Sequence, residues 1–334
     1  MLRENPQIQI QKSLVQANEF IHLDKFEEAY ELYSQTKKQF DSSSYIYNYE
    51  FYLNLAIACQ KTTRYRESIL NYRKALSFEI TPLERSQIYL NLCRIYRSLI
   101  LMKNARLELI RAFKAIKEPY PKNSITSLIA SVLNYLIGVI RTPRIGSIKK
   151  DAEIEHKVAL YEEAGLSAYY LRETNPLFQC MFRVRELVCK LGPSIQLLDW
   201  YGGKGAVYGI AGLRKKNENI NKLMNELVEK IQQPRAFGKA LVWKGFAQDY
   251  LGNPVQSAKH LATTINKYGK DLDNSEFQTS CTTIACNLNL RGHMEESIQY
   301  TELLSERNQG QEKDWSGRSN LNWYSAPAYT FWVR

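Results

Sequence analysis

Small and large residues recur along the chain with the spacing of α-helices that pack in pairs. Small residues occur in couples twelve positions apart, and the second of each couple is followed four positions later by a large side chain. The couples are Ala17 with Ala29, Ala56 with Ser68, and Cys93 with Ala105. Residues four apart share one face of a helix, so small residues let two antiparallel helices approach closely while large ones fill the space around them. The pattern predicts three helical hairpins within residues 1–117.

The same pattern returns late in the chain. Two further hairpins are expected, one with helices at 240–250 and 255–265 and one with helices at 279–290 and 294–304. Their connections, Leu251-Gly252-Asn253 and Arg291-Gly292-His293, carry the glycine that is typical of a helix end. Between the two regions, long amphipathic stretches predict more degenerate units. These stretches are 151–173, 176–191, 194–216 and 219–232. We expect five regular hairpins, with three degenerate ones between residues 151 and 231.

A single hairpin cannot bury its own apolar face, so copies must stack. The spacing resembles the tetratricopeptide repeat, a helical hairpin of 34 residues. The predicted fold is therefore an all-α, tetratricopeptide-like superhelical solenoid of antiparallel helix pairs with a helical insertion. Glycine and proline are scarce, with 16 and 10 residues among 334, which disfavours a protein built from many short strands. We expect more than about 65% helix and essentially no sheet.

The repeat is interrupted between residues 118 and 150, so three regions are expected: 1–117, 118–150 and 151–334. Two prolines exclude a helix over 118–124. The run Ile125–Ile140 carries no charged residue. The favoured interpretation is a helix packed on protein, and the alternative is an interfacial helix of a membrane-peripheral adaptor. In that alternative the basic residues after the run would face anionic lipid. They are Arg141, Arg144, Lys149 and Lys150.

Composition and motifs argue against several other classes. No apolar stretch is long enough for an ordinary transmembrane helix, and the first residues do not form a secretory signal. Six cysteines without a CxxC motif and four scattered histidines give no metal site. We expect reduced, buried thiols in a cytoplasmic protein. No nucleophile–base arrangement is visible, so we expect no enzyme and no cofactor. The segment Tyr201–Ala206 lacks phosphate-loop spacing, and its glycines favour close helix crossing.

Charge gives the best indication of a partner. The net charge is +11, and residues 61–117 hold 13 basic and 4 acidic residues. Arg94 and Arg97 lie three apart on one expected first helix, and we predict that both point into a concave groove. Such a groove would bind an acidic peptide, because the arginine fork matches carboxylates. The partner-binding candidates are Tyr52, Arg64, Tyr89, Arg94, Arg97, Arg106 and Arg111. Nucleic acid is disfavoured because no nucleic-acid motif accompanies the basic residues.

The order of elements after residue 90 adds a further resemblance. It rests on short stretches that follow the apolar run and its basic flank, namely Ala168–Tyr170, Phe182–Leu187, Gly192–Ser194 and Tyr208–Lys216. Residues 90–334 thereby resemble the C-terminal helical-repeat region of the class III, soluble-type adenylyl cyclase and signalling-ATPase family. The resemblance implies a regulatory module of a signalling protein. Neither a cyclase nor an ATPase domain is recognisable in the sequence.

Two further expectations concern partners. A non-catalytic scaffold for protein partners is the favoured function, and a peptide-sensing regulator is another alternative. The segment Trp315–Arg334 holds six aromatic residues, where a solenoid normally ends in a polar face. We expect it to fold back as a cap or to support oligomer formation through an apolar patch.

Overall fold

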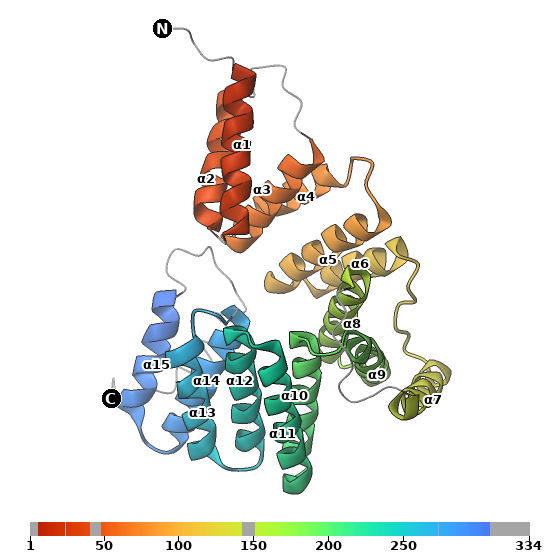
Figure 1. Cartoon of the computed structure of the whole chain (residues 1–334), viewed down its shortest axis with the longest axis vertical. Coiled ribbons are helices and arrows are strands. Elements are labelled where there is room, and N and C mark those ends of the chain that lie inside the picture. Colours follow the sequence, from red (N-terminus) through yellow and green to blue (C-terminus); the bar gives the residue numbers. More distant parts are fainter. Residues whose placement is uncertain (1–5, 24, 41–47, 142–150, 273, 308–334) are drawn as a thin grey trace. The chain divides into compact units, whose positions relative to one another are not determined.

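The computed structural model describes residues 6–23, 25–40, 48–141, 151–272 and 274–307. The described residues contain fifteen α-helices and no strand (Figure 1), and 83% of them are helical. This confirms the predicted fold class and the predicted helical content. Residues 1–5, 24, 41–47, 142–150, 273 and 308–334 lie outside the described part, and they include the candidates Arg144, Lys149 and Lys150 and the aromatic segment Trp315–Arg334.

Contacts divide the described chain into two compact units, with the division after Tyr120. The N-terminal unit holds three helix pairs. Its helices are α1 (Pro6–His22), α2 (Phe26–Phe40), α3 (Tyr49–Lys61), α4 (Tyr65–Ala75), α5 (Pro82–Ser98) and α6 (Met102–Ala115). The C-terminal unit holds a single helix followed by four pairs. Its helices are α7 (Ile125–Arg141), α8 (Ala152–Tyr170), α9 (Thr174–Leu191), α10 (Ile195–Ile210), α11 (Arg214–Ile231), α12 (Pro234–Tyr250), α13 (Pro254–Tyr268), α14 (Asn274–Leu290) and α15 (Met294–Arg307).

The helix starts follow from local chemistry. At the start of α5, the Thr81 hydroxyl accepts the Glu84 backbone N–H at 3.2 Å, and the Glu84 carboxylate accepts the Thr81 N–H at 2.9 Å. This capping box satisfies two backbone donors that the helix itself cannot. Asn48 caps α3 and Asp151 caps α8 in a similar way, each by accepting backbone N–H groups of the first turn. Short polar residues therefore fix where these helices begin.

A polar bond joins the two helices of a hairpin at the position of closest approach. In three hairpins, a side chain of the second helix donates to a backbone carbonyl of the first helix, twelve residues earlier. The bonds run from Ser68 Oγ to Ala56 O at 2.7 Å, from Asn217 Nδ2 to Gly205 O at 2.9 Å, and from Ser297 Oγ to Ala285 O at 3.0 Å. The twelve-residue couples of the sequence thus correspond to real helix–helix contacts, and the five regular hairpins are confirmed.

The degenerate region contains two hairpins rather than the three that we predicted, because residues 151–231 form only α8 to α11. The predicted helix 194–216 was too long. It ends at Ile210, since Gly212 has a left-handed backbone with φ +68° and turns the chain into α11. The prediction placed Gly212 inside a helix, although Gly252 and Gly292 had been predicted to end theirs.

The C-terminal unit keeps a strict period of forty residues in its backbone. Within its hairpins, the turn residues with positive φ are Arg172, Gly212, Gly252 and Gly292, while Gly192 and Gln232 have positive φ between hairpins. Seven residues before each of them, the first helix of the hairpin carries a glycine or alanine, namely Gly165, Gly205, Gly245 and Ala285. At Gly245, a Cβ would lie 2.6 Å from the Leu261 side chain. A small residue in the first helix and a left-handed turn seven residues later therefore recur together in all four pairs of the C-terminal unit.

The glycine-rich stretch of α10 packs against its neighbours. A Cβ at Gly202 would lie 2.1 Å from Cγ of Trp243 in α12, and a Cβ at Gly209 would lie 2.8 Å from the Ala247 carbonyl oxygen. Both distances are shorter than any real contact. The prediction that these glycines permit close helix crossing is therefore confirmed.

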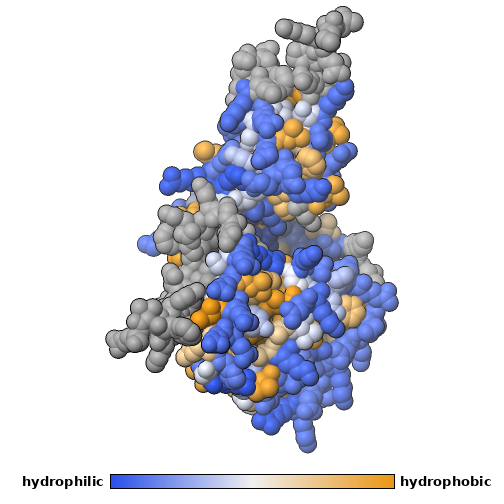
Figure 2. Space-filling view, turned by 90° about the vertical axis from the view of Figure 1, so that its left-hand side faces the viewer, coloured by the Kyte–Doolittle hydropathy of each residue, from blue (hydrophilic) through white to orange (hydrophobic). Residues whose placement is uncertain are grey.

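Buried apolar residues form a core within each unit. In the N-terminal unit, Tyr33, Leu55, Tyr72 and Leu92 are fully buried between successive pairs. On the face shown in Figure 2, hydrophilic residues predominate and hydrophobic ones form separate groups between them. No helix in the described ranges has the length and apolar character needed to cross a membrane.

Candidate functional site

A row of polar side chains connects the first helices of the N-terminal hairpins. The Asn54 amide of α3 donates to Asn18 Oδ1 of α1 at 2.9 Å, and the Asn18 amide donates to Glu50 Oε1 at 3.1 Å. The Tyr33 hydroxyl of α2 also donates to Asn18 Oδ1. Asn18 and Asn54 are half-buried. The row therefore has a defined geometry while part of its polar surface stays accessible.

A second set of polar side chains surrounds Tyr72 in the next hairpin, at the position that Tyr33 has in the first. The Tyr72 hydroxyl donates to Gln60 Oε1 of α3 at 2.7 Å. Burial raises the pKa of Tyr72, while the Asn91 side chain and the positive charge of Arg94 act in the opposite direction. The Tyr72 hydroxyl thus lies close to Asn91 and Arg94, where α3, α4 and α5 meet. Sequence reasoning missed this row, although Asn54 and Asn91 lie one repeat apart, 37 residues from each other.

Arg94 and Arg97 both lie on α5 and are half-buried. Their spacing of three places them on one side of the helix. The other side of α5 faces the core, where Ile88, Leu92 and Ile95 are fully buried. The two arginines therefore lie on a half-exposed side of α5, away from its buried apolar residues.

The two tyrosine candidates contribute to packing. Tyr52 and Tyr89 are both half-buried against the core that includes Tyr72 and Leu92. The Tyr52 ring lies 6.0 Å from the Phe78 ring, and Lys74 Nζ lies 5.2 Å from the Tyr52 centroid. Packing between successive hairpins is thus the main role that the geometry gives to Tyr52.

The remaining arginine candidates are separated from α5. Arg64 precedes α4, where it forms an ion pair with Glu27 and stacks on the Tyr30 ring at 3.9 Å. The carboxylate of Glu27 raises the pKa of Arg64, and the Arg64 hydrogen bond lowers that of Glu27. This ion pair links α2 to the start of α4, so Arg64 has a structural partner.

Arg106 and Arg111 lie on α6, the second helix of its hairpin. Arg111 Nη1 is 2.8 Å from Oε1 of the buried Glu108, and Arg73 of α4 also pairs with Glu108. The pair of Arg73 with Glu108 joins α4 to α6, and Arg111 adds a second positive charge from α6 itself. The seven partner-binding candidates therefore do not form one cluster, and only those of α3 and α5 lie on first helices.

The described residues offer little for catalysis. They contain no group of three or more His, Cys, Asp or Glu side chains that could hold a metal ion. Five of the six cysteines are buried, and burial raises the pKa of Cys180 and of Cys281 to about 12. Their thiols are protonated at neutral pH, which makes them poor nucleophiles.

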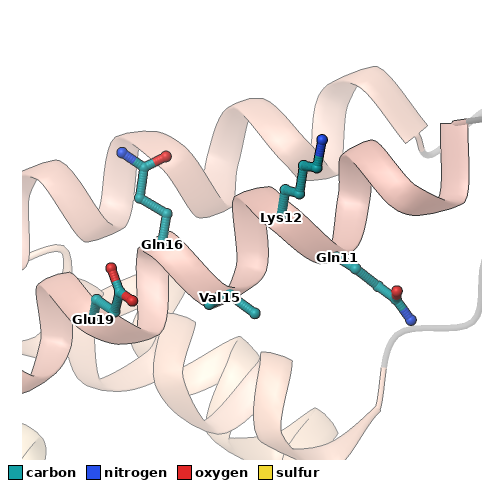
Figure 3. A pocket seen from close by; sticks show the side chains of 5 residues that line it. All are labelled: Gln11, Lys12, Val15, Gln16 and Glu19. Atoms are coloured by element: carbon teal, nitrogen blue, oxygen red, sulfur yellow. The ribbon is translucent and has the colours of Figure 1, made fainter. Parts of the chain in front are cut away.

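Among the residues that the structure describes, those that line the depression in Figure 3 all belong to one helix. The depression has a volume of about 520 Å³ and is lined by Gln11, Lys12, Val15, Gln16 and Glu19, all of α1. Side chains of a single helix give one wall, whereas ligand pockets are enclosed by several elements. We therefore assign no ligand to it.

Comparisons with known proteins support the fold. No protein-family model matches the chain, and no curated protein matches it significantly. A solved tetratricopeptide repeat protein from Parabacteroides merdae ATCC 43184 is similar, with 11% sequence identity and a TM-score of 0.54 over 94% of this chain and 97% of that one.

Two yeast structures are more distant. The Sti1 TPR2AB domain in its pHSP90 complex has 11% identity and a TM-score of 0.30, covering 96% of this chain and 99% of that one. Tom70 has 10% identity and a TM-score of 0.27, covering 97% of both chains. Only the Parabacteroides structure bears on the architecture, and with the helix pairs described above it identifies this chain's fold as a tetratricopeptide-like solenoid.

Proposed function

We propose that the protein is a non-catalytic interaction scaffold or regulatory module that binds an acidic, extended segment of a partner protein. The binding surface is the row on the first helices of the N-terminal unit, with Asn18 on α1, Asn54 on α3, and Asn91, Arg94 and Arg97 on α5. Solenoids of stacked hairpins offer extended binding surfaces of this kind. The observation that carries the proposal is that Arg94 and Asn91 both lie near the Tyr72 hydroxyl, in the hairpin next to the bonded amides Asn18 and Asn54.

The chemistry of the row fits such a segment. An amide side chain can donate and accept at once, so it can bond the backbone N–H and C=O groups of an extended peptide. Arginine presents a planar fork that binds a carboxylate through two hydrogen bonds. Amides would hold the peptide backbone, while Arg94 and Arg97 would select acidic side chains.

The charge balance supports an acidic partner. Among the four acidic residues of 61–117, Glu108 pairs with Arg73 and Arg111, and Glu84 is held in the capping box by Thr81. Thirteen basic residues in this range outnumber the four acidic ones, so a net positive charge remains. A positive field of this kind accelerates encounter with negatively charged partners.

A signalling role is the finer part of the proposal. It rests on the resemblance of residues 90–334 to the C-terminal repeats of soluble-type adenylyl cyclases and signalling ATPases. A cytoplasmic location is part of the same proposal, and reduced, buried cysteines are compatible with it.

The test uses the full chain and a fluorescently labelled Glu-rich peptide, with a Lys-rich peptide of equal length for comparison. Fluorescence anisotropy should show binding of the Glu-rich peptide alone, and the affinity should fall as salt is added. The double variant R94E/R97E should lose this binding. The control K103E/K114E changes the net charge equally at exposed positions of α6 and should retain most of it.

Equal losses in the two double variants would refute the proposal, because the effect would then come from net charge alone. Unchanged binding by R94E/R97E would refute it as well. A crystal structure that shows both arginines turned away from the row of amides would contradict the geometry directly.

A further inference from the structure

Helix α7 presents an apolar stripe that the protein does not cover. Ile125, Ile129, Leu133 and Leu136 are 69%, 55%, 55% and 52% exposed. Their spacings of four, four and three place them on one side of the helix. None of the α7 side chains that the structure describes is fully buried. We call these four residues the α7 stripe.

The helix is nevertheless held in place on the protein. It packs beside α9 (Figure 1), and the half-buried residues Leu128 and Val132 lie outside the stripe. Just before α7, the Gln179 amide of α9 donates to the Lys122 carbonyl at 2.6 Å, and the Lys122 N–H donates to Gln179 Oε1 at 3.4 Å. This part of the sequence prediction is confirmed, because α7 is a helix that packs on protein. Its stripe remains directed to the outside.

The sequence that flanks the stripe carries charge of one sign. From Pro119 to Lys150 the sequence contains no acidic residue and five basic ones, Lys122, Arg141, Arg144, Lys149 and Lys150. An apolar helix face in a basic setting is typical of helices that lie in the plane of a membrane interface. An anionic membrane attracts every lysine and arginine near its surface. An acidic groove on a partner protein would contact only a few of them.

We propose that α7 docks on an anionic lipid surface. The stripe enters the boundary between headgroups and acyl chains, and the helix axis lies parallel to the membrane. Small polar residues such as Ser127 and Ser131, on the side away from the stripe, remain with the protein. The proposal concerns a different surface from the peptide-binding row, so each can be tested without the other.

The test is flotation of the full chain with vesicles of phosphatidylcholine, with and without phosphatidylserine. The protein should float with the anionic vesicles only. The double variant I129D/L133D should partition at least about tenfold less, because two apolar side chains no longer enter the interface. The control V255D/L290D alters two exposed apolar residues of the same unit, which are 60% and 82% exposed. It changes the net charge equally and should float like the parent.

Circular dichroism should show that both double variants remain helical, and the milder I129S/L133S replaces I129D/L133D if they do not. Failure of the parent to float with anionic vesicles would overturn the proposal. Equal flotation of I129D/L133D and V255D/L290D would also overturn it, because the net positive charge alone would then explain binding. So would a lipid-free dimer that I129D/L133D converts to a monomer, since a second copy of the chain would then cover the stripe.

Discussion

Alanine at two neighbouring glycines of α10 should have opposite effects on stability. Gly202 and Gly203 are adjacent in the same helix, but they face different surroundings. A Cβ at residue 202 would lie 2.1 Å from Cγ of Trp243, whereas a Cβ at residue 203 would be 4.0 Å from Cη2 of the same ring. The second distance is an ordinary van der Waals contact, and the first requires the indole to move.

The indole of Trp243 cannot move without losing an interaction. Its Nε1–H donates to Asp199 Oδ1 at 2.8 Å, and Lys239 Nζ lies 2.6 Å from Asp199 Oδ2 and 2.6 Å from Glu276 Oε1. Side chains of α10, α12 and α14 thus form one polar network. Burial raises the pKa of Asp199, and the two carboxylates raise that of Lys239 against the opposing effect of burial. Displacement of Trp243 would leave Asp199 with one hydrogen-bond donor fewer.

The magnitudes separate the two variants. Alanine in place of glycine inside a helix gains about 1 kcal/mol. At residue 202 this gain is opposed by overpacking, which costs about 1–3 kcal/mol, and by a disrupted buried hydrogen bond, which costs about 1–3 kcal/mol. Gly202→Ala should therefore lower the free energy of unfolding by about 1–5 kcal/mol, while Gly203→Ala should raise it by about 0.5–1 kcal/mol.

Urea unfolding of the full chain, followed by far-ultraviolet circular dichroism, measures both changes. The midpoint should move to lower urea for Gly202→Ala and to higher urea for Gly203→Ala. Shifts of the same sign and size in both variants would refute the reasoning, because the close approach of α10 to α12 would then not distinguish the two positions.

Three further predictions concern turns, caps and thiols. Arg172→Gly should stabilise the protein by about 0.5–1 kcal/mol in thermal unfolding, because Arg172 has φ +58° and left-handed backbone is costly for residues other than glycine. Gly252 has φ +76°, and a Cβ there would contact no other atom. Gly252→Ala should therefore destabilise the protein by a similar amount, through backbone strain alone. Thr81→Ala should cost about 1 kcal/mol of stability at neutral pH. The Thr81 hydroxyl and N–H lower the pKa of Glu84, so the stabilisation by the charged Glu84 is present above the ordinary pKa of a glutamate and is lost as the pH falls through the lowered value. The stabilities of parent and variant should therefore converge in acid. Iodoacetamide should modify Cys286 before any other cysteine, since it alone is not fully buried, and mass spectrometry that finds another cysteine modified first in the native protein would contradict the packing.

The sequence allowed the fold to be predicted because the helix–helix contact is local. Ala56 and Ser68 lie in one hairpin, twelve residues apart, and the contact between them therefore follows from their spacing in the sequence. The ion pair between Arg73 and Glu108 could not be predicted in the same way. It joins α4 to α6, the second helices of two successive hairpins, and such a contact depends on how hairpins stack. Periodicity places a residue on a helix face, but the identity of its ionic partner follows from packing between repeats.

The missed hairpin boundary at Gly212 shows which constraint a degenerate repeat preserves. A pair of antiparallel helices needs a close approach and a reversal of the chain, and several residue types can meet each need at some cost. Glycine meets the reversal without strain at residues 212, 252 and 292, while Arg172 meets it with left-handed backbone. The left-handed turn therefore recurs every forty residues even at residue 172, where the amino acid is not glycine. Since positive φ is costly for arginine, the packing of α8 on α9 must offset that strain, and Arg172→Gly should release it without a change in the helices that Arg172 joins.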